Sequence, residues 1–241
     1  MATPRIYHPE PFSINTVITL DDNAAAHLVR VLRLQNDAPI LLFDGSGQEY
    51  AAKLTDVGKK TANAYVTHCS KTETASPLQL HLGQVISKGD RMDFTIQKAT
   101  ELGIHDITPL WSQRCDVKLN QGRLQKKCEH WQRVAISACE QSGRCQVPTI
   151  HAPQTLSDWL AQIQADCKLV LHPHNQSPLK EQAVPESVAL LVGPEGGLSD
   201  DEVALCQQRQ FNGLTLGPRI LRTETAALTA LAVLQYQWGD F

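Results

Sequence analysis

The sequence predicts an α/β protein in which a small β-rich barrel precedes a larger domain built on a parallel sheet. Three observations support this prediction. Short extended segments fill the chain before residue 72, strand and helix patterns alternate after Pro77, and two late strands each run into a glycine-containing loop. Alternating strands and helices are typical of parallel sheets. We therefore expect two domains, residues 1–72 and 73–241, and 241 residues suffice to bury both cores.

The first domain is predicted from short apolar segments separated by turn residues. The expected strands are Val17 to Leu20, Ile40 to Phe43, Gln48 to Leu54 and Thr61 to Val66. Asp44-Gly45-Ser46-Gly47 is a hairpin signal between two of them, and a short helix is expected from Asn23 to Leu32. Lys71 to Pro77 contains no apolar residue larger than alanine, as expected of a linker.

The second domain begins with a strand from Leu78 to Ile86 and a helix from Arg91 to Leu102, which Gly103 is expected to end. An amphipathic helix follows, because apolar residues recur at steps of four and three. Its buried positions are Leu124, Cys128, Trp131, Ala135 and Ala138, which leaves Lys126, Lys127 and Arg133 facing solvent. The other expected strands are Ile107 to Leu110, Lys168 to Leu171, Ala189 to Val192 and Leu214 to Leu216.

Composition excludes several classes of protein. The longest nearly apolar run, Ala226 to Leu234, is too short to span a bilayer, and the amino terminus lacks an apolar signal core, so we expect a cytoplasmic protein without membrane contact. The seven cysteines form no C-x-x-C pair, so we expect neither a disulfide framework nor a metal. With a net charge of −3, any nucleic-acid site must be a local basic patch.

The first late loop is Gly193 to Gly197, which follows the buried strand ending at Val192. Glycines let a ligand approach the backbone closely, at the strand end where α/β sheets bind ligands. Ser199 and Glu202 have the spacing of a capping box, so the residues after the glycines are expected to begin a helix.

The second loop, Gly217 to Arg222, also follows a strand, and Thr223 can cap the next helix. That helix is apolar nearly all round, so protein must cover it, either in the core or at a subunit interface, and of these we expect a dimer. Neither loop has the Rossmann or Walker pattern. Neutral glycine turns beside aliphatic residues fit a flat adenine better than a phosphate.

These loops resemble the two cofactor loops of the 16S ribosomal RNA uracil-N3 methyltransferases, which belong to the SPOUT superfamily. The resemblance rests on Gly193 to Gly197 and Leu216 to Ala226. It extends through Pro4 to Tyr7, His27 to Arg33, Gln97 to Gly103 and Ala138 to Arg144, and so covers the whole chain.

The resemblance implies a PUA-like barrel followed by a SPOUT domain with a carboxy-terminal trefoil knot. It also implies a homodimer that uses S-adenosylmethionine to methylate N3 of one uridine, U1498, in 16S ribosomal RNA of the small ribosomal subunit. The residues expected to hold the cofactor are Leu171, Val192, Gly193, Pro194, Glu195, Gly196, Gly197, Leu216, Gly217, Ile220, Leu221 and Thr223.

Methyl transfer to N3 needs alignment, proton removal and stabilisation of charge on the uracil oxygens. We expect Arg222 to stabilise that charge, the alternative being a simple ion pair with Glu224. Glu140, Glu224 or solvent could take the proton, and Glu195 is expected to order its loop. The residues expected to contact RNA are Arg5, Arg30, Arg33, Arg114, Lys127 and Arg144, each of which could instead be a solvated surface residue.

Two alternatives stay open at this point. The chain could be a noncatalytic RNA-binding or ribosome-assembly factor with the same fold, which would bind no S-adenosylmethionine. It could also be a SPOUT enzyme that methylates a ribose 2′-oxygen or another base.

Overall fold

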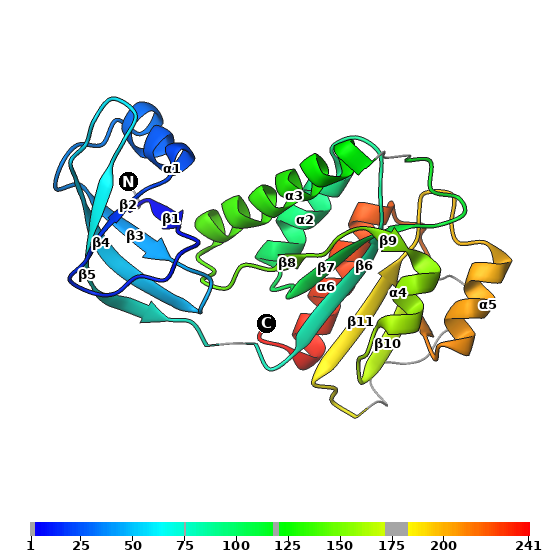
Figure 1. The fold of residues 1–241 in the computed structure, drawn as a ribbon. Helices are drawn as coiled ribbons and strands as arrows, with labels where there is room; N and C mark the ends of the chain where they lie inside the picture. The colour runs from blue at the N-terminus through cyan, green and yellow to red at the C-terminus, as the bar shows by residue number, and fades with distance from the viewer. Residues whose placement is uncertain (1–2, 75, 118–120, 172–182) are drawn as a thin grey trace. The chain divides into compact units, whose positions relative to one another are not determined.

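The computed structural model describes residues 3–74, 76–117, 121–171 and 183–241 (Figure 1). The chain forms two compact units. The first comprises residues 1–75 together with 139–147, and the second comprises 76–138 together with 148–241.

The first unit is built on a five-stranded sheet with the order β1-β3-β4-β5-β2. Its strands are β1 (Arg5–Tyr7), β2 (Val17–Thr19), β3 (Pro39–Phe43), β4 (Gln48–Thr55) and β5 (Asn63–Thr72). All neighbours are antiparallel except β1 and β3. Alternate residues of the strands enclose an apolar core that includes Leu42, Leu54 and Val66.

The predicted helix of this unit forms as two consecutive segments, α1 (Asp22–Ala26) and the π-helical η1 (His27–Val31). The carboxylate of Asp21 accepts a hydrogen bond from the Ala24 amide at 2.8 Å and so caps α1. Sequence patterning did not predict β1, and β5 continues to Thr72. The expected linker is therefore shorter than Lys71 to Pro77.

The first unit also includes the carboxy-terminal end of the long helix α3 (Gln121–Ser142) and the residues that follow it. Arg5 Nη1 donates to the carbonyl of Cys139 at 2.7 Å. The Glu73 carboxylate accepts from the amides of Cys145 and Gln146 at 2.6 and 3.0 Å. These hydrogen bonds, formed between residues distant in sequence, tie the segment 139–147 to the sheet.

The second unit contains a parallel sheet with the order β12-β10-β11-β6-β7-β8, and β9 also pairs with β7. Its strands are β6 (Gln79–Val85), β7 (Asp106–Trp111), β8 (Thr149–Ile150), β9 (Gln154–Thr155), β10 (Cys167–Leu171), β11 (Ser187–Val192) and β12 (Asn212–Leu214). This α/β arrangement confirms the predicted fold class of the second domain.

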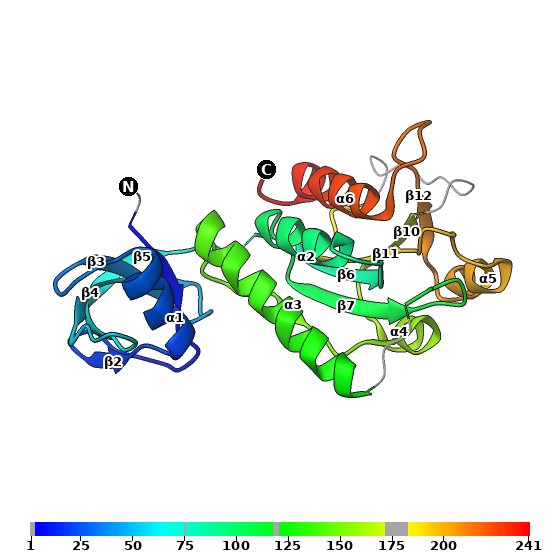
Figure 2. The same cartoon turned by 90° about the horizontal axis from the view of Figure 1, so that it is seen from above.

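Helices cover both faces of this sheet. On one face, α2 (Arg91–Glu101) and α6 (Thr223–Trp238) lie side by side (Figure 2) and share a core with α3. On the other face, α4 (Leu156–Gln162) and α5 (Asp200–Gln208) pack on β10 and β11. Trp159 of α4 lies against Gly83 of β6, where an added Cβ would come within 2.6 Å of the indole ring.

Helix ends agree with the predicted signals at two places and differ at a third. Gly103 follows α2 with φ +83°, as its αL role requires, and Ser199 and Glu202 form both hydrogen bonds of the capping box. At α6, Arg222 is the N-cap and Thr223 is already the first helical residue, so the expected cap at Thr223 is wrong by one position.

Candidate active site

The two late loops of the second unit enclose a pocket at the carboxyl ends of β10 and β11. The pocket has a volume of about 570 Å³. Its walls are Arg91, Leu171, Val192, Gly193, Pro194, Glu195, Gly197, Leu198, Ile220, Leu221, Arg222, Thr223 and Ala226. A parallel sheet binds ligands at this edge, because its strand ends and loops meet there.

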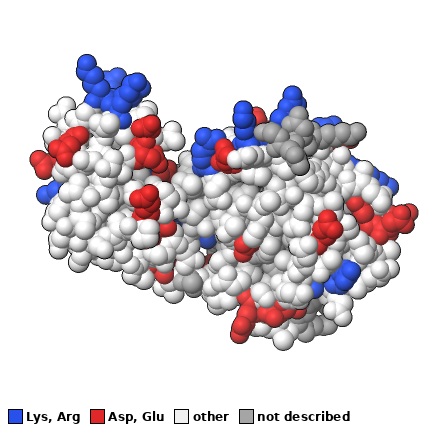
Figure 3. All heavy atoms as spheres, in the orientation of Figure 1, with Lys and Arg blue, Asp and Glu red and all other residues white. Residues whose placement is uncertain are grey.

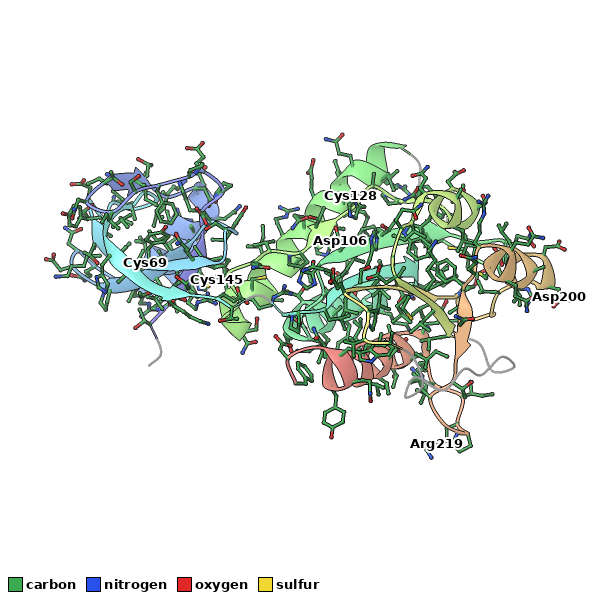
Figure 4. The ribbon with its side chains drawn as sticks, turned by 90° about the horizontal axis from the view of Figure 1, so that it is seen from below. Cys69, Asp106, Cys128, Cys145, Asp200 and Arg219 are labelled. Atoms are coloured by element: carbon green, nitrogen blue, oxygen red, sulfur yellow. The ribbon has the colours of Figure 1, made fainter. Side chains whose placement is uncertain are left out.

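A second pocket of about 360 Å³ adjoins the first and shares Leu171, Ile220, Leu221 and Ala226 with it. Its remaining walls come from the loop between β12 and α6, including Leu216 and Gly217. Figure 4 shows Arg219 at the tip of this loop. The two pockets together contain main-chain groups of both loops and an aliphatic lining, which fits a flat, partly apolar ligand.

The structure brings together eleven of the twelve residues expected to hold the cofactor, because all of them except Gly196 line one of the two pockets. Gly196 faces Arg114, whose Cβ lies 3.6 Å from the position of an added Gly196 Cβ. Arg114 Nη1 also donates to the carbonyls of Gly196 and Leu198 at 3.1 and 3.3 Å. Arg114, expected at the RNA surface, thus holds the first loop from outside.

Arg91 is a pocket residue that sequence reasoning missed. Its Nη1 lies 2.8 Å from Glu195 Oε1, and its Nε lies 3.9 Å from Glu224 Oε1. The first residue of α2 therefore links the first loop to the first turn of α6. In the sequence, Arg91 could be noticed only as a basic residue two positions after Gly89. Its place in the pocket depends on the fold, which brings it beside Glu195, more than 100 positions later.

The residues expected to act in catalysis lie in different environments. Arg222 is exposed at the pocket wall and forms no ion pair with any described residue, so the alternative of a pair with Glu224 is not what the structure shows. Glu224 is 13% exposed, and its Oε2 accepts from the Thr223 hydroxyl at 3.2 Å. Thr223 also lies 3.3 Å from the Ser87 hydroxyl.

Glu140 does not line either pocket. It belongs to the first unit, where its Oε1 accepts a hydrogen bond from the Tyr7 amide at 3.1 Å. Burial raises the pKa of this carboxyl above its ordinary value, although the Tyr7 hydrogen bond opposes the shift. The side chain therefore has a structural role in joining α3 to β1.

The expectation that Arg5 contacts RNA is corrected by its surroundings. The Arg5 side chain is 10% exposed, and its Nε lies 2.6 Å from the equally buried Glu49 carboxylate. Its other nitrogens donate to the carbonyls of Cys139 and Arg144, and the guanidinium lies 4.8 Å from the centre of the Phe43 ring. Arg5 is thus committed to holding the first unit together.

Other basic residues remain on the surface. Arg30 and Arg33 are exposed, and Arg30 Nε donates to the Lys59 carbonyl at 3.5 Å. Figure 3 shows Lys and Arg side chains gathered at the end of the first unit where α1 lies. Lys127 is half-buried with its ammonium 5.9 Å from the Trp131 ring centre, and Arg144 is half-buried.

No helix in the described parts of the chain combines the length and apolarity that crossing a bilayer requires.

Comparison with known proteins gives consistent matches over both units. A sequence family described as the RNA methyltransferase domain matches residues 74–235, and one described as the RNA methyltransferase PUA domain matches residues 20–64. A protein of Buchnera aphidicola named ribosomal RNA small subunit methyltransferase E is 35% identical over 99% of this chain and 95% of its own. A protein of Bacillus subtilis with the same name is 33% identical over 88% and 86%.

Two solved structures match over their whole length. The ribosomal RNA small subunit methyltransferase E of Neisseria gonorrhoeae, bound to S-adenosyl methionine, is 41% identical, with a TM-score of 0.93 and coverage of 100% of both chains. A Legionella pneumophila protein in complex with the cofactor SAM is 40% identical, with a TM-score of 0.97 and the same coverage.

Proposed function

Because this chain belongs to the RNA methyltransferase family, we propose that it transfers a methyl group from S-adenosylmethionine to N3 of uridine U1498 in 16S ribosomal RNA. The observation that carries the proposal is the pocket between Gly193 to Gly197 and Ile220 to Thr223, in a chain similar over its whole length to proteins solved with this cofactor.

The pocket residues fit S-adenosylmethionine. About 570 Å³ is within the usual range for a ligand of this size. Leu171, Ile220 and Leu221 offer aliphatic surfaces for the adenine, and the glycines of the first loop leave their main-chain groups accessible. The guanidinium of Arg91, which lies beside Glu195, offers a positive charge for the carboxylate of the cofactor. When bound, the cofactor supplies an electrophilic methyl group on a sulfonium.

Arg222 and Glu224 are the residues we assign to the chemistry. The exposed Arg222 guanidinium can donate to a uracil carbonyl and stabilise the negative charge that develops when N3 loses its proton. Glu224 is the better-placed of the two candidate bases, because it lies two positions after Arg222 and 3.9 Å from Arg91 of the pocket wall, whereas Glu140 is committed to Tyr7. Solvent remains the alternative acceptor of the proton.

We propose that residues 1–72 form the PUA-like RNA-binding domain and residues 73–241 the SPOUT-type methyltransferase domain. The exposed Arg30 and Arg33 are the first candidates for phosphate contact, with Lys127 and Arg144 as further candidates. We also propose that the late loops belong to a trefoil knot. The sheet order supports this, because the chain passes from β11 across β10 to place β12 on the far side.

A homodimer is proposed from the surface of α6 and the loop before it. Val233 and Tyr236 are 38% and 78% exposed although α6 is a largely apolar helix, and Ile220 of the pocket wall is fully exposed. A second copy covering this surface would also close the cofactor pocket. We place the protein in the cytoplasm, where its proposed ribosomal substrate is found.

The decisive test is mass spectrometry of small-subunit RNA from a strain that lacks this protein. We expect one 3-methyluridine to disappear and to return when the gene is supplied again, but not when it carries Arg222→Ala. An unchanged modification pattern would remove the proposed target. Loss of a ribose methylation instead would assign the chain to a different methylation reaction.

Calorimetric titration with S-adenosylmethionine separates the enzyme from a noncatalytic factor with the same fold. We expect saturable binding that Gly197→Ala weakens, since Gly197 lines the pocket. Absence of binding in the folded protein would support a role in RNA binding or ribosome assembly alone.

A further inference from the structure

Three side chains that can bind a metal lie near the amino-terminal ends of strands in the second unit's sheet. The pocket lies at the opposite, carboxyl ends of the strands. His81 lies in β6, Asp106 begins β7, and His151 follows β8. His81 and Asp106 are partners in strand register, and the His151 amide donates to the Ile107 carbonyl at 2.9 Å. Figure 4 labels Asp106 on the sheet. One ligand atom from each side chain lies within 4.8 Å of the other two.

The His81 ring is held by neighbours that leave one nitrogen available. Its Nε2 lies 2.7 Å from the hydroxyl of the buried Thr108, and the Trp159 indole donates to the same nitrogen at 3.4 Å. The ring also stacks on His151, with centres 5.3 Å apart and planes 11° apart. No described residue forms a hydrogen bond with Nδ1 of His81.

His151 and Asp106 supply the other donors and the access from solvent. His151 Nε2 lies 2.7 Å from Asp106 Oδ1, and the two side chains are 40% and 38% exposed. Both can therefore rotate without disturbing the core, whereas His81 is anchored on the sheet. The cluster thus combines one fixed donor with two adjustable donors.

We propose that His81, Asp106 and His151 form a binding site for a divalent transition metal of the class that includes Zn²⁺ and Co²⁺. Imidazole nitrogens and a carboxylate oxygen are ordinary ligands of these ions, and three protein ligands leave one position for water. The site is separate from the proposed methyl-transfer site and does not depend on it.

Closure of the site requires only side-chain movement. Bonds of about 2.1 Å in a tetrahedral site place ligand atoms roughly 3.4 Å apart. The present limit of 4.8 Å must therefore shrink, which rotation of the exposed His151 and Asp106 can achieve. The ion replaces the hydrogen bond between His151 Nε2 and Asp106 Oδ1, and the neutral His151 ring then carries its proton on Nδ1. With the ion on Nδ1, the proton of the neutral His81 ring lies on Nε2 and donates to the Thr108 hydroxyl, in place of the 3.4 Å hydrogen bond that Nε2 accepts from Trp159. Such an outer hydrogen bond commonly orients a histidine ligand.

Metal binding would connect β6, β7 and the segment after β8. Because the three ligands come together only in the folded sheet, a bound ion favours the folded state over the unfolded chain. We expect the thermal midpoint of unfolding to rise with Zn²⁺ concentration.

The test uses the full-length protein without a histidine tag, with Co²⁺ absorption and Zn²⁺ calorimetry as readouts. We expect one equivalent to bind, with the visible absorption of four- or five-coordinate Co²⁺. Asp106→Asn and His151→Gln should each weaken binding at least tenfold while circular dichroism and S-adenosylmethionine binding stay unchanged. If one variant fails to fold, the other retains the test.

His130→Gln is the matched control. His130 Nε2 lies 2.6 Å from Asp93 Oδ2, and its side chain is 42% exposed, so it is a comparable pair that lies outside the cluster. This control should bind metal as the unchanged protein does. The proposal is overturned if neither ion binds stoichiometrically below millimolar concentration, or if His130→Gln weakens binding as much as the cluster variants do.

Discussion

Replacement of Gly197 by alanine probes the cofactor pocket with a single methyl group. Gly197 has φ +72°, and an added Cβ would meet no atom within 4 Å. The substitution therefore causes no clash in the free protein, and its effect on stability comes from the left-handed backbone alone, about 1 kcal/mol. For a domain of this size, that corresponds to a fall of roughly 3 °C in the midpoint of thermal unfolding.

The same methyl group should interfere with the cofactor, because Gly197 lines the pocket. We expect the dissociation constant for S-adenosylmethionine to rise at least tenfold, which corresponds to about 1.4 kcal/mol. Calorimetric titration measures this constant directly, and thermal unfolding on the same preparation measures the change in stability.

Gly45→Ala is the control for backbone strain. Gly45 has φ +92°, the nearest atom to its added Cβ is Tyr7 Cε2 at 3.8 Å, and it lines neither pocket. It should lose a similar amount of stability and keep its cofactor affinity. The reasoning is refuted if Gly197→Ala binds the cofactor as tightly as the unchanged protein does, or if both variants lose affinity equally.

Three further substitutions test the other assignments. Arg222→Ala should lower the single-turnover rate of methyl transfer to small ribosomal subunits about 100-fold, because one charge-stabilising donor is lost. It should leave S-adenosylmethionine affinity within a factor of two. A rate equal to that of the unchanged enzyme would contradict the role of Arg222. Glu140→Gln should keep activity and should change unfolding free energy in a pH-dependent way. Because the pKa of Glu140 is raised in the folded state, ionisation opposes folding as pH rises past the ordinary value for a carboxyl. The free energy of unfolding of the variant, measured with urea, should therefore rise relative to that of the parent between pH 4 and pH 7. If the two proteins differ by the same amount at pH 4 and at pH 7, the raised pKa of Glu140 is contradicted. Arg5→Ala should lower the unfolding free energy by about 3 kcal/mol, since it leaves the buried Glu49 carboxylate unpaired; a loss below 1 kcal/mol would show that the pair is dispensable.

Local sequence patterns predicted the elements whose signals are local. The strand from Gln48 and the capping box of Ser199 and Glu202 were found because alternation and capping depend on residues a few positions apart. The three-residue β1 was missed, because so short a strand carries no recognisable period. The attachment of residues 139–147 to the first unit was also missed, since it depends on long-range contacts such as that of Glu73 with Cys145.

The candidate site shows the same division between local and long-range information. The glycine loops could be recognised because each follows its own strand. Charge alone could not separate the roles of arginines, because the buried Arg5 and the exposed Arg33 both stand next to apolar residues in the sequence. Arg91 and the cluster around Asp106 depend on which strands and helices become neighbours, and that is set by the whole fold.

The most direct test of the proposed function is a crystal structure of the protein with S-adenosylmethionine. We predict density for the adenosyl group between the main chain of residues 193–197 and the side chains of Leu171, Ile220 and Leu221, with the methyl group facing the side on which Arg222 lies. Full occupancy of the cofactor at a different place, with these two loops unchanged and in contact with no ligand, would contradict the assignment of this pocket.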